Sequence, residues 1–210
     1  MSTVMIFAGG DPVPQTLRGE LPDADFVIAA DSGHDIALTL GVGVDVIVGD
    51  FDSLSPASPV AETTQRIDFP ADKDATDLEL AFQLASERQP RRVVVVGAEG
   101  GRFDHELSAL GLISSPRWSG VPEIEWIRSD SHIYLVRNTI RIQGDPGEHI
   151  SLLALAGDAV GVTTTGLVWA LDDEILRHGS SRGTSNQFSS PEATIRVGSG
   201  TLLAVIPRGT

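Results

Sequence analysis

The chain has 210 residues, 41% of them hydrophobic, which is enough for one large domain or two small ones with a sizeable core. Its 29 acidic residues against 15 basic ones give a formal net charge of −14, which argues against a nucleic-acid partner because such binding needs a basic face. The absence of cysteine excludes disulfides, thiolate zinc sites and a cysteine nucleophile.

The first residues predict a strand rather than a targeting signal. Residues 1–7 contain a short apolar run with no basic region before it, which is not the pattern of a signal peptide. No apolar stretch reaches the length of a membrane span. We therefore expect a cytoplasmic protein with no membrane partner.

The first half of the chain alternates strand-like and helix-like segments. Short apolar runs that end at Gly or Asp predict strands at residues 4–8, 26–30, 46–48 and 93–96. Helices are predicted at residues 34–40, 77–88 and 103–113. This alternation predicts a mostly parallel α/β sheet domain over residues 1–121, with ligands at the carboxyl ends of its strands.

The second half has a different pattern. After a segment rich in Ser, Pro and Gly at residues 114–122, short strand candidates are separated by Gly, Asp and Pro turns. These candidates are residues 123–128, 132–136, 139–142, 150–155, 194–197 and 201–206. Their spacing predicts an all-β, sandwich-like or barrel-like antiparallel domain over residues 122–210.

A short turn with one carboxylate follows the second predicted strand. In Ala30-Asp31-Ser32-Gly33 the small residues let a ligand approach the backbone, and the helix that starts here favours anions. Asp31 is a candidate to accept hydrogen bonds from a ribose or an amine, or to help order a metal. The alternative is that Asp31 or Ser32 caps the helix.

The sharpest acidic motif, Gly49-Asp50-Phe51-Asp52-Ser53, follows the third predicted strand. Residues two apart in an extended chain point the same way, so Asp50 and Asp52 could present carboxylates to one point. Two carboxylates that close repel each other unless a cation or a proton lies between them, and Mg²⁺ takes oxygen ligands while leaving positions for phosphate. The alternative is a solvated acidic turn.

The third segment, residues 72–79, opens the second predicted helix. Thr76 and Glu79 form a capping-box pattern, and acidic residues suit a first helical turn. Capping does not require Lys73, whose ammonium could instead neutralise a phosphate. Asp74 and Asp77 are three residues apart and would share a helix face.

A glycine-rich turn, Gly97-Ala98-Glu99-Gly100-Gly101-Arg102-Phe103-Asp104-His105, follows the fourth predicted strand. A strand, a glycine-rich turn and a helix start form a phosphate cradle, although neither the usual P-loop ending nor the dinucleotide fingerprint is present. Arg102 offers a fork of donors for phosphate oxygens, and Asp104 is a candidate to bind metal or to orient a hydroxyl. The four segments together place carboxylates, one Lys and one Arg at one sheet edge, which suits phosphoryl-type transfer.

These four segments, in this order, resemble those of the thiamine pyrophosphokinase family. The matching pieces are Asp31-Ser32-Gly33, Gly49-Asp50-Phe51-Asp52-Ser53, Lys73-Asp74-Ala75-Thr76-Asp77 and Gly100-Gly101-Arg102-Phe103-Asp104-His105. The likeness covers most of residues 1–115. It continues in Thr165-Gly166-Leu167 and Thr184-Ser185-Asn186, which are similar to the weaker pattern of the family's thiamine-binding β-domain.

The resemblance implies in-line transfer of a pyrophosphoryl group from Mg-ATP to the hydroxyl of thiamine, with release of AMP. It also implies a homodimer whose active site lies between the α/β domain of one chain and the β-domain of the other. The implied site residues are Asp50, Asp52 and Asp77 for Mg²⁺, Lys73, Thr76 and Arg102 for phosphates, Asp31, Gly33, Ser53, Gly100 and Gly101 for the nucleotide, and Asp104, Ser185 and Asn186 for thiamine. Asp104 is also the candidate general base.

Several alternatives remain open from the residues themselves. The family often has Asp-Gly-Gly-Ala-Asn where this chain has Asp31-Ser32-Gly33-His34-Asp35, and often has Asn where this chain has Ala109. A pyrophosphokinase for another alcohol such as a pterin is one alternative, and a non-catalytic sensor of nucleotide or thiamine diphosphate is another. Ser185 and Asn186 taken alone favour turn positions, and Trp169 is either an aromatic partner of thiamine or a core residue.

Overall fold

The computed structural model describes residues 2–51, 58–70 and 72–209, and its contacts divide the chain into two compact units, Met1–Ser129 and Asp130–Thr210. The division after Ser129 lies beyond the expected one between residues 121 and 122, because one further strand belongs to the first unit. The binding of ATP and Mg²⁺ by the first domain and of thiamine by the second stays a prediction.

The first unit contains a parallel sheet with the strand order β6-β5-β1-β2-β3-β4. Its strands are β1 (Thr3–Ala8), β2 (Phe26–Ala30), β3 (Val46–Gly49), β4 (Gln65–Asp68), β5 (Arg92–Gly97) and β6 (Glu123–Ile127). Its helices are α1 (Gly33–Thr39), α2 (Asp77–Glu87) and α3 (Phe103–Ile113), with short 3-10 turns at Gln15–Glu20 and Pro116–Trp118. The predicted α/β class is confirmed.

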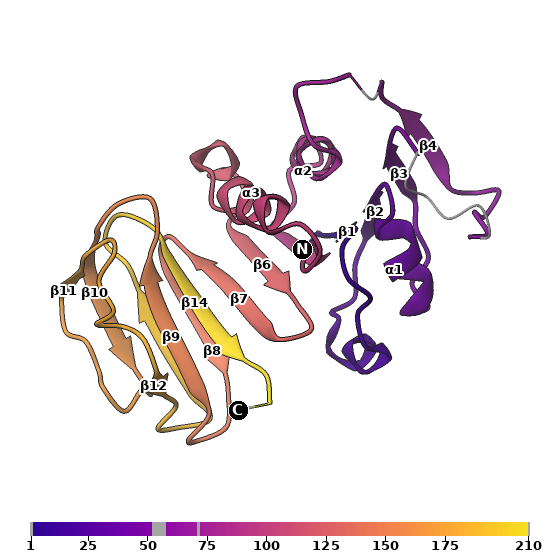
Figure 1. Ribbon diagram of the computed structural model, residues 1–210. Coiled ribbons are helices and arrows are strands. Elements are labelled where there is room, and N and C mark those ends of the chain that lie inside the picture. Colours follow the sequence, from indigo (N-terminus) through magenta and orange to yellow (C-terminus); the bar gives the residue numbers. More distant parts are fainter. Residues whose placement is uncertain (1, 52–57, 71, 210) are drawn as a thin grey trace. The chain divides into compact units, whose positions relative to one another are not determined.

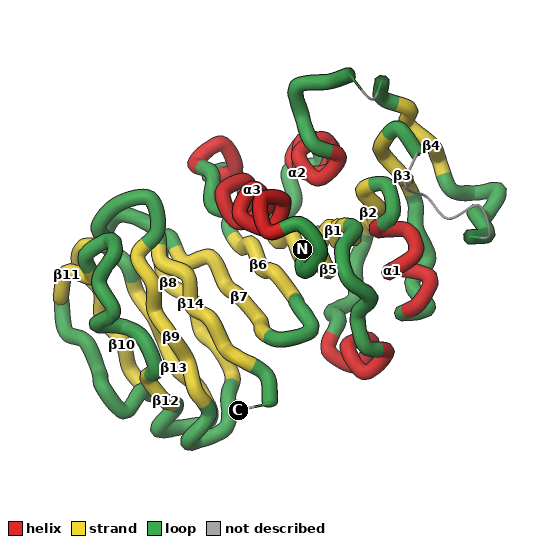
Figure 2. Tube along the Cα trace, in the orientation of Figure 1, coloured by secondary structure: helices red, strands yellow, loops and turns green. Residues whose placement is uncertain are grey.

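Helices cover both faces of this sheet, which is why its central strands are apolar on both sides. Met5 and Phe7 of β1 pack on one face with Ile36 and Ala37 of α1. Buried residues of α2, such as Phe82, lie on the opposite face, where α2 and α3 run side by side (Figures 1 and 2). An unbroken apolar run such as Val93-Val94-Val95-Val96 is the consequence.

Strand β6 corrects one expectation. Residues 123–128 were predicted as the first strand of the antiparallel domain, but β6 pairs in parallel with β5. The Ser-, Pro- and Gly-rich segment before this strand suggested that a new domain begins there, but the strand belongs to the parallel sheet. Glu125 is only 5% exposed, because Arg92 neutralises it through two hydrogen bonds of 2.7 Å.

The strands of the second unit form two antiparallel layers, which confirms the predicted all-β class. One sheet has the order β12-β9-β14-β7 and the other the order β11-β10-β13-β8. The strands are β7 (Ser131–Val136), β8 (Thr139–Gln143), β9 (His149–Ala154), β10 (Ala159–Thr165), β11 (Glu174–Leu176), β12 (Asn186–Gln187), β13 (Glu192–Arg196) and β14 (Leu202–Pro207). A core that includes Ile142, Leu152, Phe188 and Ile195 fills this unit.

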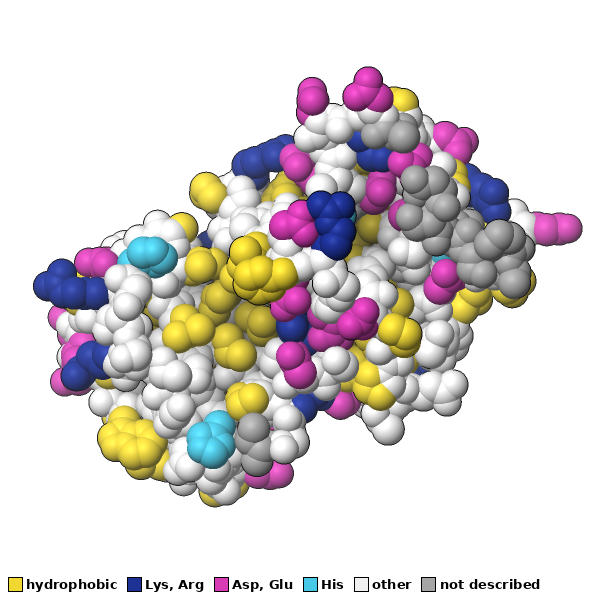
Figure 3. Space-filling view, in the orientation of Figure 1, with side chains coloured by type: hydrophobic (Ala, Val, Ile, Leu, Met, Phe, Trp, Pro, Cys, Tyr) yellow, Lys and Arg dark blue, Asp and Glu magenta, His cyan; other side chains and the backbone are white. Residues whose placement is uncertain are grey.

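The surface reflects the negative formal charge. Acidic side chains gather in several places on the face presented in Figure 3, with basic side chains among them. Across the residues that the structure describes, no helix combines the length and the apolar character needed to cross a bilayer.

Candidate active site

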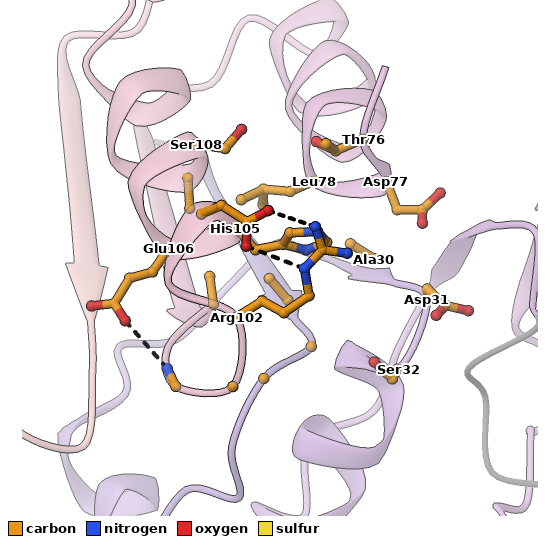
Figure 4. Close-up of a pocket in the computed structure, with 18 of the residues that line it drawn as sticks. Ala30, Asp31, Ser32, Thr76, Asp77, Leu78, Arg102, His105, Glu106 and Ser108 are labelled. Atoms are coloured by element: carbon orange, nitrogen blue, oxygen red, sulfur yellow. Dashed lines mark hydrogen bonds and ion pairs between the residues drawn. The ribbon is translucent and has the colours of Figure 1, made fainter. Parts of the chain in front are cut away.

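A cavity of about 740 Å³ opens at the carboxyl ends of the strands of the first unit, in the place where parallel sheets bind ligands. Figure 4 shows side chains from the turn after β2, from the start of α2 and from α3 around it. The lining includes these predicted site residues: Asp31, Lys73, Thr76, Asp77, Gly100, Gly101, Arg102 and Asp104.

Three carboxylates converge beside this cavity, two of which, Asp31 and Asp77, belong to its lining, whereas Asp50 does not. Asp31 follows β2, Asp50 follows β3, and Asp77 is the first residue of α2, and one oxygen of each lies within 4.8 Å of the others. The main-chain N–H of Asp31 donates to Val48 O at 2.8 Å, which ties the turn after β2 to β3. The structure therefore brings Asp50 and Asp77 together and places beside them Asp31, which was also a candidate to help order a metal.

Gly49 leaves the space in which these carboxylates meet. A Cβ at this position would lie 3.1 Å from the Cβ of Asp31 and 3.3 Å from Oδ1 of Asp77. Any larger residue would push the two acids apart. Asp52 and Ser53, the other predicted residues of this motif, lie outside the described residues.

Lys73 is the cation beside the carboxylates. Its Nζ lies 3.1 Å from Oδ1 of Asp77 and 3.6 Å from Oδ2 of Asp50. Burial by itself would lower the pKa of the Lys73 ammonium, but the hydrogen bond and charge of Asp77, together with Asp50, outweigh it and hold the pKa above its ordinary value. Three carboxylate oxygens this close to one another favour a divalent cation between them.

The glycine-rich loop between β5 and α3 forms the far wall. Its main chain is left-handed at Ala98, with φ of 57°, and at Gly100 and Gly101, with φ of 73° and 64°. A Cβ at Gly100 would lie 2.0 Å from Oδ2 of Asp11, so only glycine fits there.

A second glycine turn, which sequence reasoning missed, supports this loop. Gly9, Gly10 and Asp11 follow β1 and line the cavity, and a Cβ at Gly10 would lie 2.4 Å from Glu99 O. The main-chain N–H of Asp11 donates to Glu99 O at 2.7 Å. The sequence did carry a signal for this turn, because Gly9-Gly10 directly follows the apolar strand predicted at residues 4–8.

Arg102 and Asp104 form a bidentate pair at the mouth of the cavity. The Nε of Arg102 donates to Oδ1 of Asp104 at 3.1 Å and Nη2 to Oδ2 at 2.5 Å, as drawn in Figure 4. The hydrogen bond from Arg102 holds the pKa of the Asp104 carboxyl below its ordinary value, against the opposing effect of desolvation. The pair places a guanidinium and a carboxylate side by side at the cavity, where the two can contact a phosphate and a hydroxyl.

Thr76 serves as a helix cap and also lines the cavity. Its hydroxyl accepts from the main-chain N–H of Glu79 at 3.2 Å, which confirms half of the capping box. The carboxylate of Glu79 is ion-paired with Arg117. Asp74 precedes α2, so the expectation that Asp74 and Asp77 share a helix face is wrong.

Gly33, a predicted site residue, and its neighbour His34 both have structural roles. Gly33 is not part of the cavity lining, and a Cβ there would lie 2.1 Å from Phe7 O, so glycine lets α1 approach β1. His34 is 3% exposed, and its Nε2 lies 3.0 Å from Pro59 O, which is a hydrogen bond with His34 as donor.

In the second unit, Asn186 holds Trp169. The Oδ1 of Asn186 accepts from the main-chain N–H of Trp169 at 3.1 Å, and its Nδ2 donates to Trp169 O at 2.8 Å. Asn186 is 6% exposed, whereas Trp169 is 59% exposed, so the alternative of a core tryptophan is wrong. Ser185 is exposed beside Asn186, and its main-chain N–H donates to Oγ of Ser151 at 3.0 Å.

Comparisons with known proteins agree with this arrangement. The family model described as "Thiamin pyrophosphokinase, catalytic domain" matches residues 17–122, and the one described as "Thiamin pyrophosphokinase, vitamin B1 binding domain" matches residues 137–202. Thiamine pyrophosphokinase of Bacillus subtilis is 29% identical over 98% of both chains. Thiamine pyrophosphokinase 1 of Oryza sativa is 31% identical over 73% of this chain, which spans 61% of that protein's length.

Solved structures give the same result. A crystal structure of thiamine pyrophosphokinase from Bacillus subtilis covers 100% of both chains with a TM-score of 0.87 and 27% identity. A thiamin pyrophosphokinase family protein from Enterococcus faecalis covers 100% of both chains with a TM-score of 0.80 and 27% identity.

Proposed function

Since the chain belongs to the thiamine pyrophosphokinase family of enzymes, we propose that it transfers the pyrophosphoryl group of ATP to the hydroxyl of thiamine and releases AMP. The observation that carries the proposal is the set of three carboxylates and Lys73 opposite a glycine-rich loop and Arg102, around one cavity at the carboxyl edge of the sheet. Such a set neutralises and positions phosphates, which is most of what phosphoryl transfer requires.

The carboxylate cluster fits Mg²⁺. Oxygen ligands from Asp31, Asp50 and Asp77 lie close enough to share one ion, and the missing Cβ of Gly49 keeps them close. A bound Mg²⁺ would neutralise charge on the phosphate oxygens. The part predicted for Asp52 remains a proposal.

Lys73, Arg102 and the main-chain amides of the glycine-rich loop then bind the phosphates. In the transfer, the hydroxyl oxygen of thiamine forms a bond to the β-phosphorus and its proton passes to water, while the bond from that phosphorus to the oxygen shared with the α-phosphate breaks and AMP leaves. Lys73 and Arg102 offset the negative charge that grows on the groups being transferred and released. Thr76, Gly100 and Gly101 line the same cavity, where they border the nucleotide.

Trp169 is the proposed aromatic partner of thiamine. A thiazolium ring is a cation, and a tryptophan face is the best aromatic surface for one. An exposed Trp whose main chain is held on both sides by a buried Asn186 is a rigid surface for such a ring. Asn186 thus acts on thiamine through Trp169, with Ser185 exposed at its side.

We further propose a homodimer in which the second unit of one chain completes the site of the other, as the family resemblance implies. The expected result of sedimentation equilibrium is a mass twice that of the chain at enzyme concentrations used for assay. A chain that sediments as a monomer while fully active would overturn this proposal.

The function is tested by following AMP release from ATP in the presence of Mg²⁺ and thiamine. We expect release that depends on thiamine and that stops when Mg²⁺ is removed with EDTA. Release with a pterin alcohol but not with thiamine would contradict the proposed acceptor. Thermal stabilisation by ATP or thiamine diphosphate without any AMP would instead support the non-catalytic sensor.

A further inference from the structure

A buried ion network lies beside the glycine-rich loop, outside the groups assigned so far. Arg128, directly after β6, has its Nη1 2.7 Å from Oε1 of Glu106 and its Nε 3.6 Å from Oε2 of Glu99. The side chains of Arg128 and Glu99 are 11% and 6% exposed. Charges this buried are costly to hold, so their placement needs an explanation.

Both carboxylates of this network also bind the main chain of the loop or its neighbours. Oε2 of Glu106 accepts from the main-chain N–H of Gly100 at 3.4 Å, a contact drawn in Figure 4. Oε1 of Glu99 accepts from the main-chain N–H of Ser129 at 2.7 Å. The main-chain oxygen of Glu99 accepts from Asp11 N. The network therefore joins the middle of the loop to the strand end of β6.

The start of the loop is held by the same region. Trp126 Nε1 donates to Gly97 O at 2.6 Å, and the guanidinium of Arg128 lies 4.8 Å from the centre of the Trp126 ring. The guanidinium of Arg128 thus contacts Trp126, which binds the start of the loop at Gly97. It also pairs with the carboxylates of Glu99 and Glu106, which hold the middle of the loop.

The loop needs such support because its backbone is unusual. Ala98 is left-handed without being glycine, and Gly97, Gly100 and Gly101 also have positive φ. Conformations of this kind persist only where the surroundings over-determine them. Arg102 follows directly, so the path of the loop decides where its guanidinium and the loop amides face the cavity.

We propose that Arg128 is a positioning residue that, through Glu99 and Glu106, holds the glycine-rich loop in the conformation that binds the phosphates of the nucleotide. The proposal rests on the proposed function in one respect only, the assignment of the loop to nucleotide phosphate. Arg128 itself does not line the cavity.

A second buried pair in the same unit gives a matched control. Arg92 at the start of β5 makes two hydrogen bonds of 2.7 Å to Glu125 of β6, and Glu125 is 5% exposed. The pair of Arg92 and Glu125 joins β5 to β6, whereas Arg128 joins the end of β6 to the loop and to α3, and Arg92 lies at the opposite end of β5 from the cavity. A role in stability alone would make the two arginines equivalent.

The test compares Arg128→Met with Arg92→Met by thermal unfolding and by calorimetric titration with a non-hydrolysable Mg-ATP analogue. Each substitution leaves buried carboxylates without their arginine, so we expect both melting temperatures to fall by about 5 to 10 °C. Only Arg128→Met should raise the Kd for the analogue, by about tenfold, which is a typical effect of losing a group that orients a binding site. Equal affinities in the two variants would overturn the proposal.

If Arg128→Met folds poorly, a combined variant separates the effect of Arg128 on the loop conformation from its effect on the stability of the fold. Arg128→Met with Glu99→Gln and Glu106→Gln removes the unpaired charges while leaving acceptors for Ser129 and Gly100. We expect the melting temperature to recover and the weak affinity to remain. Recovery of both would mean that Arg128 only stabilises the fold. The affinity measurement does not depend on turnover. If the chain binds the analogue but releases no AMP, the proposed function is contradicted, but the comparison of affinities still tests the role of Arg128.

Discussion

Replacing Asp77 by Asn is expected to lower kcat for AMP release by about 10³-fold while leaving the fold intact, since groups that stabilise transition-state charge contribute effects of this size. Asp77 is one of three carboxylates within 4.8 Å, and it is also the nearer partner of Lys73, at 3.1 Å. The amide keeps the size of the side chain and its place at the start of α2. It removes the charge that would hold Mg²⁺ and that fixes Lys73 for the phosphates.

Asp74→Asn is the matched control for this prediction. Asp74 is exposed, lies three residues before Asp77 and is not part of the cavity lining. The turnover of Asp74→Asn should therefore be close to that of the unchanged chain. Turnover is measured at saturating ATP and thiamine over a series of Mg²⁺ concentrations, and the fold is checked by circular dichroism. Near-normal turnover of Asp77→Asn at all Mg²⁺ concentrations would remove the metal assignment.

The sequence predicted the four apolar strands of the first unit because their signal is local, and it missed the mostly polar β4. The run Val93-Val94-Val95-Val96 can only be a buried strand or a buried helix segment, and its flanking glycine favours the strand. The same local logic assigned residues 123–128 to the wrong domain, because the pairing of β6 with β5 joins segments that are distant in the chain. It also missed β10, whose Thr163, Thr164 and Thr165 carry no clear apolar alternation.

Much of the candidate site could be predicted as a set of residues, but its geometry could not. Three of the four segments were found because each follows a predicted strand, and the third segment was found because it opens a predicted helix. That Asp31 joins Asp50 and Asp77 depends on the parallel register of β2 and β3, in which Ala30 lies opposite Val48. The pairing of Arg128 with Glu99 is likewise a property of the folded sheet, since the two residues follow neighbouring strands that are distant in sequence.

Trp169→Ala is expected to raise the KM for thiamine by about 10- to 100-fold and to leave kcat and the KM for ATP nearly unchanged. The range corresponds to the loss of one desolvated contact between a cation and a tryptophan face. The effect falls on KM because a stacked ring that takes no part in the chemistry is bound equally well before and during the transfer. Trp169→Phe should recover part of the loss, since an aromatic face remains.

Intrinsic fluorescence gives a second measurement that does not depend on turnover. Of the three tryptophans, Trp118 and Trp126 are 4% and 2% exposed, so a change of emission on adding thiamine should come from Trp169. Asn186→Ala should reduce this change and raise the KM for thiamine by less than Trp169→Ala does, because the indole remains but its main chain is no longer held. Ile175→Ala, another exposed apolar position of the same unit, serves as the control. An unchanged KM for thiamine in Trp169→Ala would mean that the thiazolium ring binds elsewhere. Asn186 would then have a purely structural role in the turn that carries Trp169.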